Sequence, residues 1–303
     1  MAHQPSKPPV LLVSLALALL LALLGYAFQA HFFVPPVTPP ETSVTIQPPA
    51  LLHPDQMLPD VVYEQEPPPL PVPAPVPLVR KEGEPARIAV IIDDVGISRQ
   101  QVAPLFDLPQ KVTLAFLPYG HATPAMSQQA ADAGYEVMLH LPMQPAGDAN
   151  PGPDALTVGL DEADVQQRLQ AALAKVPAAV GVNNHMGSAA TSDVMLMQHF
   201  MLALKPTGKF FIDSFTTADS VAYASAQAQG IPTRRRDVFL DNNPSEEAIE
   251  RQLAQAERLA ERHGSTIVIG HPYSSTIAVL TRWLPALESR GIKVVKVSEL
   301  LGS

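Results

Sequence analysis

From residue 86 onward, short apolar runs alternate with stretches of helical spacing, and this alternation restricts the possible folds more than any other feature. The eight predicted strands are Arg87–Asp94, Val112–Pro118, Glu136–Met143, Ala179–Met186, Lys209–Ser214, Thr233–Asp241, Thr266–His271 and Ile292–Val297. Strands that alternate with helices form parallel sheets with crossover helices. Over about 218 residues this pattern predicts an α/β fold, a parallel (β/α) barrel or a distorted version of one.

The clearest helical pattern between these strands covers Glu246–Arg262. Ser245 is a good N-cap, and His263-Gly264 is a stop signal. The residues that mark one face of this predicted helix are Ile249, Leu253, Ala256 and Ala260.

Residues 10–28 form an apolar run of nineteen residues without a charge, about long enough to cross a bilayer. Lys7 precedes the run, and no Lys or Arg follows until Arg80. This asymmetry predicts a cytoplasmic tail over residues 1–9, a single inner-membrane anchor over 10–28 and a periplasmic remainder. A cleaved signal peptide is the alternative, with Gly25-Tyr26-Ala27 as a poor cleavage site.

Proline is concentrated before the barrel pattern begins. Fifteen prolines lie between Pro35 and Pro77, with five acidic residues and no basic one. Such a composition favours extended polyproline II structure and cannot supply a packed core. We therefore expect residues 29–85 to be a disordered, semi-rigid linker, followed by one domain over residues 86–303.

Composition excludes several classes of function. The chain has 29 acidic and 20 basic side chains, a formal net charge of −9, which argues against nucleic-acid binding. No cysteine is present, so thiolate metal sites and cysteine nucleophiles are excluded. The chain also lacks the GxSxG, HExxH, P-loop and GxGxxG motifs, which disfavours serine hydrolases and nucleotide enzymes.

Polar side chains gather at the carboxyl ends of the predicted strands, the rim on which barrel active sites lie. They are Asp93, Asp94, His140, Asn183, Asn184, His185, Asp213, Asp241 and His271. A single residue of this kind at a strand end is more often structural, but together they indicate a divalent metal site, with zinc preferred. A second carboxylate beside the ligands could take a proton from water, and a histidine opposite could protonate a leaving amine. The set predicts metal-assisted hydrolysis of an amide or ester.

The motifs around these residues resemble those of the polysaccharide deacetylases, the NodB-like carbohydrate esterases. The resemblance rests on Asp93-Asp94 followed by Val-Gly, on His140-Leu-Pro-Met-Gln144-Pro145, and on Ile269-Gly-His271. Together with the run from Asn183 to Ser188, the pattern is most similar to the divergent polysaccharide deacetylases of bacterial envelopes. The resemblance covers essentially all of residues 86–303 and implies a catalytic domain of NodB-like fold.

The resemblance implies a role for each matching residue. Asp93 would be the general base, Asp94 and His140 metal ligands, and His271 the acid that protonates the leaving group. Gln144 stands where the family has its second ligating histidine, and His185 could supply that imidazole. The family's arginine-containing third motif is absent, so Arg236 and Asp237 are candidates for tuning the base, with a surface ion pair as the alternative. The residues expected around the site, or in contact with substrate, are Gln144, Asn184, Asp213, Arg236, Asp237 and Asp241.

Two functions remain open at this stage. One is a metal-dependent hydrolase that removes acetyl groups from an envelope glycan such as peptidoglycan. The other is a catalytically degenerate envelope protein that binds a glycan or a protein partner on the same fold. Gln144 favours the second function, whereas the set of Asp93, Asp94 and His271 favours the first.

Overall fold

The computed structural model describes residues 83–97, 103–109 and 111–301. These residues include nearly all of the domain predicted over residues 86–303. The predicted tail 1–9 and membrane span 10–28 lie outside them, as does the predicted linker up to residue 82. Among the described residues, no helix combines the length and apolar character needed to cross a membrane.

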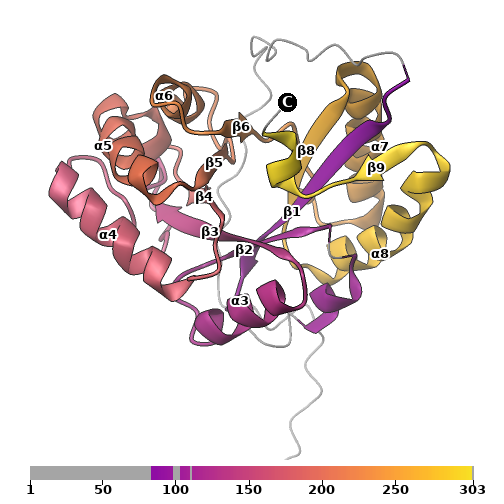
Figure 1. Cartoon of the computed structure of the whole chain (residues 1–303), viewed down its shortest axis with the longest axis horizontal. Helices are drawn as coiled ribbons and strands as arrows, with labels where there is room; N and C mark the ends of the chain where they lie inside the picture. The colour runs from indigo at the N-terminus through magenta and orange to yellow at the C-terminus, as the bar shows by residue number, and fades with distance from the viewer. Residues whose placement is uncertain (1–82, 98–102, 110, 302–303) are drawn as a thin grey trace, which may run out of the picture. The chain divides into compact units, whose positions relative to one another are not determined.

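Parallel strands form a curved sheet, and the helices lie on its outside (Figure 1). The strands are β1 (Ala86–Val95), β2 (Thr113–Phe116), β3 (Glu136–Met143), β4 (Gly181–Met186), β5 (Phe210–Asp213), β6 (Thr233–Arg235), β7 (Val238–Phe239), β8 (Ser265–Gly270) and β9 (Ile292–Val294). The α-helices are α3 (Thr123–Asp132), α4 (Glu162–Lys175), α5 (Val194–Leu204), α6 (Ala222–Ala228), α7 (Glu246–His263) and α8 (Ser274–Ser289). Short 3₁₀ helices are η2 (Ala103–Asp107), η3 (Ala190–Ser192), η4 (Lys205–Thr207) and η5 (Val297–Leu300).

The strand order is β6-β5-β4-β3-β2-β1-β8-β7, with β9 paired to the start of β1. All the ladders are parallel, which confirms the predicted distorted parallel barrel. Within the described chain no ladder joins β6 to β7, so the barrel is open at this point, which we call the seam.

At the seam, the structure differs from one predicted strand. Sequence periodicity predicts one strand over Thr233–Asp241, but the chain changes neighbours in its middle. The Arg236 amide donates to Asp213 O at 2.9 Å on one side, and the Asp237 amide donates to Ile267 O at 2.9 Å on the other. Because consecutive amides bond to opposite edges of the opening, the segment splits into β6 and β7.

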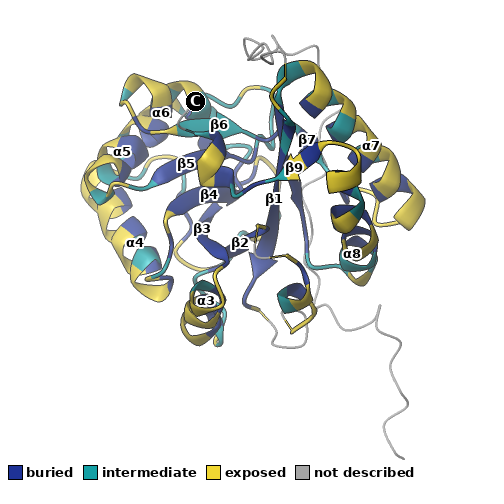
Figure 2. Cartoon of the chain, turned by 45° about the vertical axis from the view of Figure 1, so that its right-hand side comes forward, coloured by how far each residue is buried: buried dark blue, intermediate teal, exposed yellow. Residues whose placement is uncertain are grey.

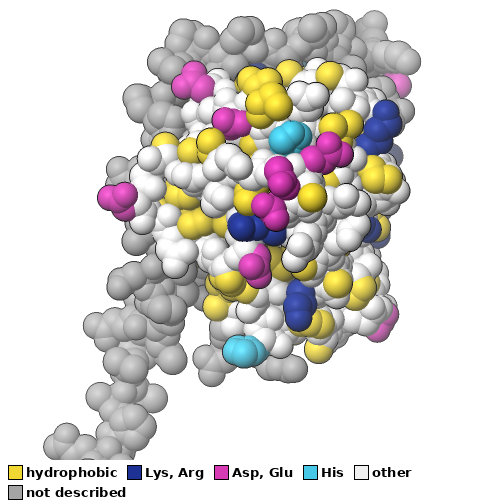
Figure 3. All heavy atoms as spheres, turned by 90° about the vertical axis from the view of Figure 1, so that its left-hand side faces the viewer, with side chains coloured by type: hydrophobic (Ala, Val, Ile, Leu, Met, Phe, Trp, Pro, Cys, Tyr) yellow, Lys and Arg dark blue, Asp and Glu magenta, His cyan; other side chains and the backbone are white. Residues whose placement is uncertain are grey.

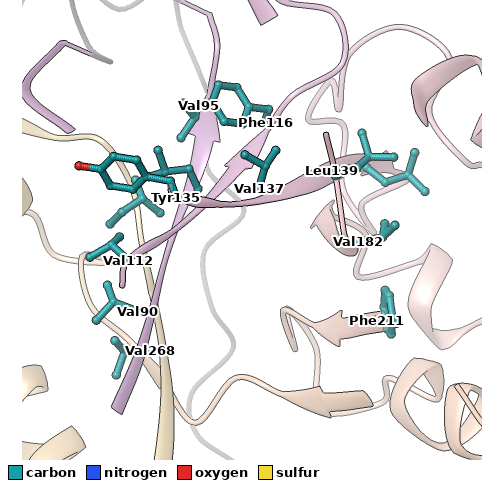
Figure 4. Close-up of a cluster of buried hydrophobic side chains, with 14 of the residues drawn as sticks. Val90, Val95, Val112, Phe116, Tyr135, Val137, Leu139, Val182, Phe211 and Val268 are labelled. Atoms are coloured by element: carbon teal, nitrogen blue, oxygen red, sulfur yellow. The ribbon is translucent and has the colours of Figure 1, made fainter. Parts of the chain in front are cut away.

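Side chains alternate along the strands and so build two apolar layers. One layer packs between sheet and helices and includes Val90, Val137, Leu139, Val182 and Phe211 (Figure 4). The other fills the barrel interior, with Ala89, Ile91, Met138, Ile212 and Ile267 among its members. Figure 2 shows the buried strands enclosed by helices whose outer faces are exposed.

The segment after β9 covers the amino ends of the first strands. Val297 and Leu300 join the interior apolar layer. The Val297 amide donates to Thr113 Oγ1 at 3.4 Å, and the Ser298 amide donates to Glu136 Oε1 at 3.2 Å. The eighth predicted strand, Ile292–Val297, is therefore shorter than expected, because its end turns into η5 to cover the interior.

Helix α7 forms as its sequence pattern predicts. Ser245 Oγ accepts the Ala248 amide, and Gly264 ends the helix in the left-handed region at φ 83°. The predicted apolar face, which consists of Ile249, Leu253, Ala256 and Ala260, is buried.

Acidic and basic side chains are interspersed on the left-hand side of the molecule as Figure 1 is drawn (Figure 3). The absence of nucleic-acid binding stays a prediction.

Candidate metal centre

A β-bulge at the end of β1 brings two consecutive carboxylates to one place. Between Ile92 and Val95, β1 advances three residues while β2 advances two, and Asp94 has a φ of 55°. Consecutive side chains of a regular strand point to opposite faces, but a bulge re-aims one of them. Both Asp93 and Asp94 are consequently buried at the carboxyl rim of the barrel.

Asp94, His140 and His185 form a triangle of ligand atoms at this rim. Asp94 Oδ1 lies 2.9 Å from His185 Nδ1 and 3.2 Å from His140 Nε2. The two imidazole nitrogens are 3.1 Å apart. A tetrahedral zinc ion with bonds of about 2.0–2.1 Å would hold its ligand atoms about 3.3 Å apart. The triangle therefore has the size of one face of such a site.

The buried carboxylate of Asp94 supports the same interpretation. Both of its oxygens are buried, and neither has a hydrogen-bond partner of acceptable geometry in the described structure. Leaving a buried charged acceptor unsatisfied is costly, so a cation is the expected partner. The three ligand residues come from β1, β3 and β4, and the residues present fit a divalent metal ion.

The surroundings shift the pKa values of Asp93 and Asp94 in opposite directions. Burial raises the pKa of Asp93 above its ordinary value, although His140, His271 and Asn183 act against this. Burial also acts on Asp94, but His185 and His140 hold the pKa of Asp94 well below its usual range. Pairs of acids whose pKa values are pushed apart are typical of sites in which the two groups have different tasks.

Asn183 links Asp93 to His140, and sequence reasoning did not single it out for this place. Its Nδ2 donates to Asp93 Oδ1 at 2.8 Å and to Asp93 Oδ2 at 3.0 Å. Its Oδ1 lies 3.0 Å from His140 Nδ1. Strand alternation was the signal available, because residues 183 and 185 share a face of β4 and Asn184 lies on the other.

His271 follows β8 and is fixed by Asp241. Its Nδ1 lies 2.9 Å from Asp241 Oδ1, and its backbone amide donates to Asp241 Oδ2 at 2.6 Å. Thr276 Oγ1 donates to the same Oδ2 at 2.7 Å. Burial opposes the imidazolium, yet the Asp241 carboxylate raises the pKa of His271 to about 9. The other ring nitrogen, His271 Nε2, lies 3.9 Å from Asp94 Oδ2 and so is close to the ligand triangle.

Gln144 and Asn184 organise loops near the site. Gln144 Oε1 accepts the Val158 amide at 2.8 Å, so this side chain is bound to the loop after β3. Asn184 Oδ1 accepts the Ser214 amide at 2.8 Å, and its Nδ2 donates to Met186 O at 2.7 Å. Gln144 is outside the ligand triangle, and His185 is in it.

The remaining predicted residues form hydrogen bonds with the segments around the seam. Asp213 accepts from Ser220 Oγ at 2.7 Å and from the Phe215 amide at 2.9 Å. Arg236 donates to Ser214 O at 2.7 Å and to Phe215 O at 2.9 Å. Asp237 accepts the Ile267 amide at 2.8 Å. These contacts of Arg236 and Asp237 lie on the two sides of the seam, and a role for either residue in tuning Asp93 stays a prediction.

A pocket of about 60 Å³ opens onto the ligand residues. Its lining includes the side chains of Asp93, His140, His185, Arg236, Phe239 and His271. The candidate base, the histidine opposite and two of the metal-ligand candidates therefore face one small cavity, which has room for a small reacting group next to the metal position.

Three of the known proteins that are similar to this chain show its relationships. An uncharacterized protein of Haemophilus influenzae is 39% identical over 195 residues, which are 64% of this chain and 70% of that protein. The uncharacterized protein YibQ of Escherichia coli K12 is 36% identical over 215 residues, 71% of this chain and 67% of that one. The crystal structure of an uncharacterized protein of Agrobacterium tumefaciens C58 has a TM-score of 0.70 and 30% identity, covering 74% of this chain and 92% of that one.

A family model supplies the classification. The model described as divergent polysaccharide deacetylase matches residues 90–301, a range that begins within β1 and contains every residue of the candidate metal centre. This confirms the resemblance drawn from the sequence motifs. The chain belongs to the divergent polysaccharide deacetylase family.

Proposed function

We propose that the protein is a metal-dependent hydrolase that removes acetyl groups from N-acetylated sugars of an envelope glycan such as peptidoglycan. The observation that carries the proposal is the buried triangle of Asp94, His140 and His185, with Asp93 and His271 facing the same pocket. We further propose zinc as the metal, because two imidazoles and one carboxylate form a donor set that zinc accepts.

The residues around the pocket have separate roles in the proposed reaction. Asp93 takes the proton from the attacking water, and Asn183 orients its carboxylate. His271, whose Nδ1 is held by Asp241, gives a proton from Nε2 to the leaving nitrogen. The C–N bond of the acetamide breaks, and acetate and a free amine result. A bound divalent ion would polarise the acetyl carbonyl and lower the pKa of the attacking water.

The test uses the purified full-length chain, an N-acetylated oligosaccharide and a measurement of released acetate. Wild type is expected to contain about one zinc per chain and to release acetate. Asp93→Asn should keep the metal and lose hydrolysis, because the amide cannot accept the proton. Loss of metal in Asp93→Asn would reassign Asp93 as a ligand. A wild-type chain that binds no metal under any condition would refute the hydrolase mechanism.

A catalytically degenerate binding protein is the second candidate, and Gln144 favours it. The family motif has a ligating histidine at this position, and here the side chain bonds to the Val158 amide instead. Under this function the chain binds N-acetylated oligosaccharide without releasing acetate. Metal content and acetate release, measured on the same preparation, separate the two functions.

We propose that residues 10–28 anchor the chain in the inner membrane with the barrel domain in the periplasm. The uncharged run and the position of Lys7 support this topology. The protein should resist carbonate extraction from membranes, and protease added on the periplasmic side should reach the domain. A mature chain that starts near Phe28 and is free in the periplasm would exclude the anchor.

A further inference from the structure

The side-chain amide of Asn183 contacts both a candidate metal ligand and the candidate base. Asn183 Oδ1 faces His140 Nδ1, and Asn183 Nδ2 faces both oxygens of Asp93. His140 is a candidate metal ligand through its other nitrogen, and Asp93 is the candidate base. Asn183 is fully buried, so solvent cannot replace either contact.

The chemistry of the partners sets the orientation of this amide. An ionised carboxylate only accepts hydrogen bonds, so the NH₂ group of Asn183 must face Asp93. Its oxygen then faces His140 Nδ1, which must carry the proton. His140 Nε2 is left with its lone pair directed at Asp94 and His185, as a metal ligand requires.

We propose that Asn183 is a positioning residue that couples metal binding to the placement of the base. Its oxygen fixes the tautomer of His140 for the metal, and its NH₂ group holds the Asp93 carboxylate toward the pocket. The proposal rests on the proposed function, because it assigns Asn183 a part in that reaction. Asn183 itself reaches the metal position and the attacking water only through its two neighbours.

The two ends of the amide can be separated by substitution. Asn183→Asp keeps an oxygen for His140 Nδ1 but removes the donor to Asp93 and places two carboxylates against each other. Asn183→Leu is of similar size and removes both contacts, together with the hydrogen bond that Nδ2 donates to Ser214 Oγ at 3.2 Å. The double change Asn183→Asp with Asp93→Asn restores the pairing in reverse, because the new amide at position 93 donates to the new carboxylate at position 183.

Metal binding is measured by titrating the full-length chain with Co²⁺ alone and following its visible absorption. Asn183→Asp should bind Co²⁺ within about threefold of wild type, whereas Asn183→Leu should bind about 10- to 100-fold more weakly. The melting temperature should fall in Asn183→Asp and recover in the double variant. Asn150→Asp is the matched control, because residue 150 is exposed and its Oδ1 accepts the Gly152 amide at 2.9 Å. It should change neither property.

Acetate release by the same variants is measured in a separate assay. Asn183→Asp and the double variant should both lose acetate release while they retain metal. Wild-type Co²⁺ affinity in Asn183→Leu, or a double variant no more stable than Asn183→Asp, would overturn the coupling. If the wild-type chain releases no acetate, the proposed function fails, and the titration and melting experiments still decide whether Asn183 joins the two groups.

Discussion

At the scale of single residues, the two adjacent carboxylates of the candidate centre, Asp93 and Asp94, have different surroundings. Asp94 faces two imidazoles, whereas Asp93 faces an amide and lies farther from the nearest ring, 3.7 Å from His140 Nδ1. The first arrangement favours a permanently ionised ligand. The second allows a carboxylate to take up a proton during a reaction.

The third ligand can be tested by comparing two substitutions. His185→Ala should lose the metal, because two strong protein donors are too few for a tetrahedral site. Gln144→Ala should retain it, because the Gln144 side chain is bound to the Val158 amide at 2.8 Å. Metal analysis of both purified variants checks this. Metal loss in Gln144→Ala, with metal retained in His185→Ala, would exchange the two assignments.

Asp241 offers a test of the acid that does not disturb the ligand triangle. Asp241→Asn should lower kcat for acetate release by about 10²- to 10⁴-fold, the usual contribution of a general acid. The reason is that the amide cannot stabilise the imidazolium of His271 as the carboxylate does. Metal content should stay at the wild-type level. Unchanged kcat would show that His271 needs no carboxylate partner.

Residues at strand ends were predictable from sequence, but their mutual contacts were not. Asp93, Asp94, His140, His185 and His271 could be placed at one rim because parallel strands end together. Asn183 could be placed at the same rim but could not be given a role, because its role depends on hydrogen bonds to two residues that are far away in the chain. Such bonds leave no local pattern in the sequence.

At the scale of elements, local signals predicted helix α7 more accurately than the strand at the seam. Helix α7 has its cap, its buried face and its terminal glycine where the sequence places them. The predicted strand over residues 233–241 was wrong as a single element, because tertiary pairing to β5 and to β8 divides it. Alternation alone cannot indicate which neighbour a strand pairs with.

The cap of α7 provides a quantitative check. Ser245→Ala should lower the free energy of unfolding by about 1 kcal/mol, the usual value of an N-cap side chain. Chemical denaturation of the full-length chain measures this difference. Ser289→Ala is a suitable control, because Ser289 is exposed at the other end of a helix and donates to Ala286 O. A loss of equal size in both variants would argue against a specific capping contribution.

At the scale of the whole molecule, a ligand that binds only the folded barrel stabilises it. A divalent ion at a free concentration of 100 times its Kd should add about 2.7 kcal/mol to the free energy of unfolding. Melting of the full-length chain with zinc and with chelator measures the effect. Asp94→Asn should abolish the response to zinc, because it removes the anionic oxygen and leaves only two strong protein donors. An equal response in Asp94→Asn would place the ion elsewhere.

The pairing of β1 has a consequence for how the domain folds. This strand, the first of the barrel, lies between β2 on one side and β8 on the other, and β9 pairs with its start. A growing chain that has reached only residue 264 has made neither β8, nor β9, nor the segment that covers the barrel interior. Contacts between such distant segments raise the contact order and slow folding. The barrel therefore completes its folding only after residues 265–301 are available, and until then β1 exposes an unpaired edge that chaperones would have to protect.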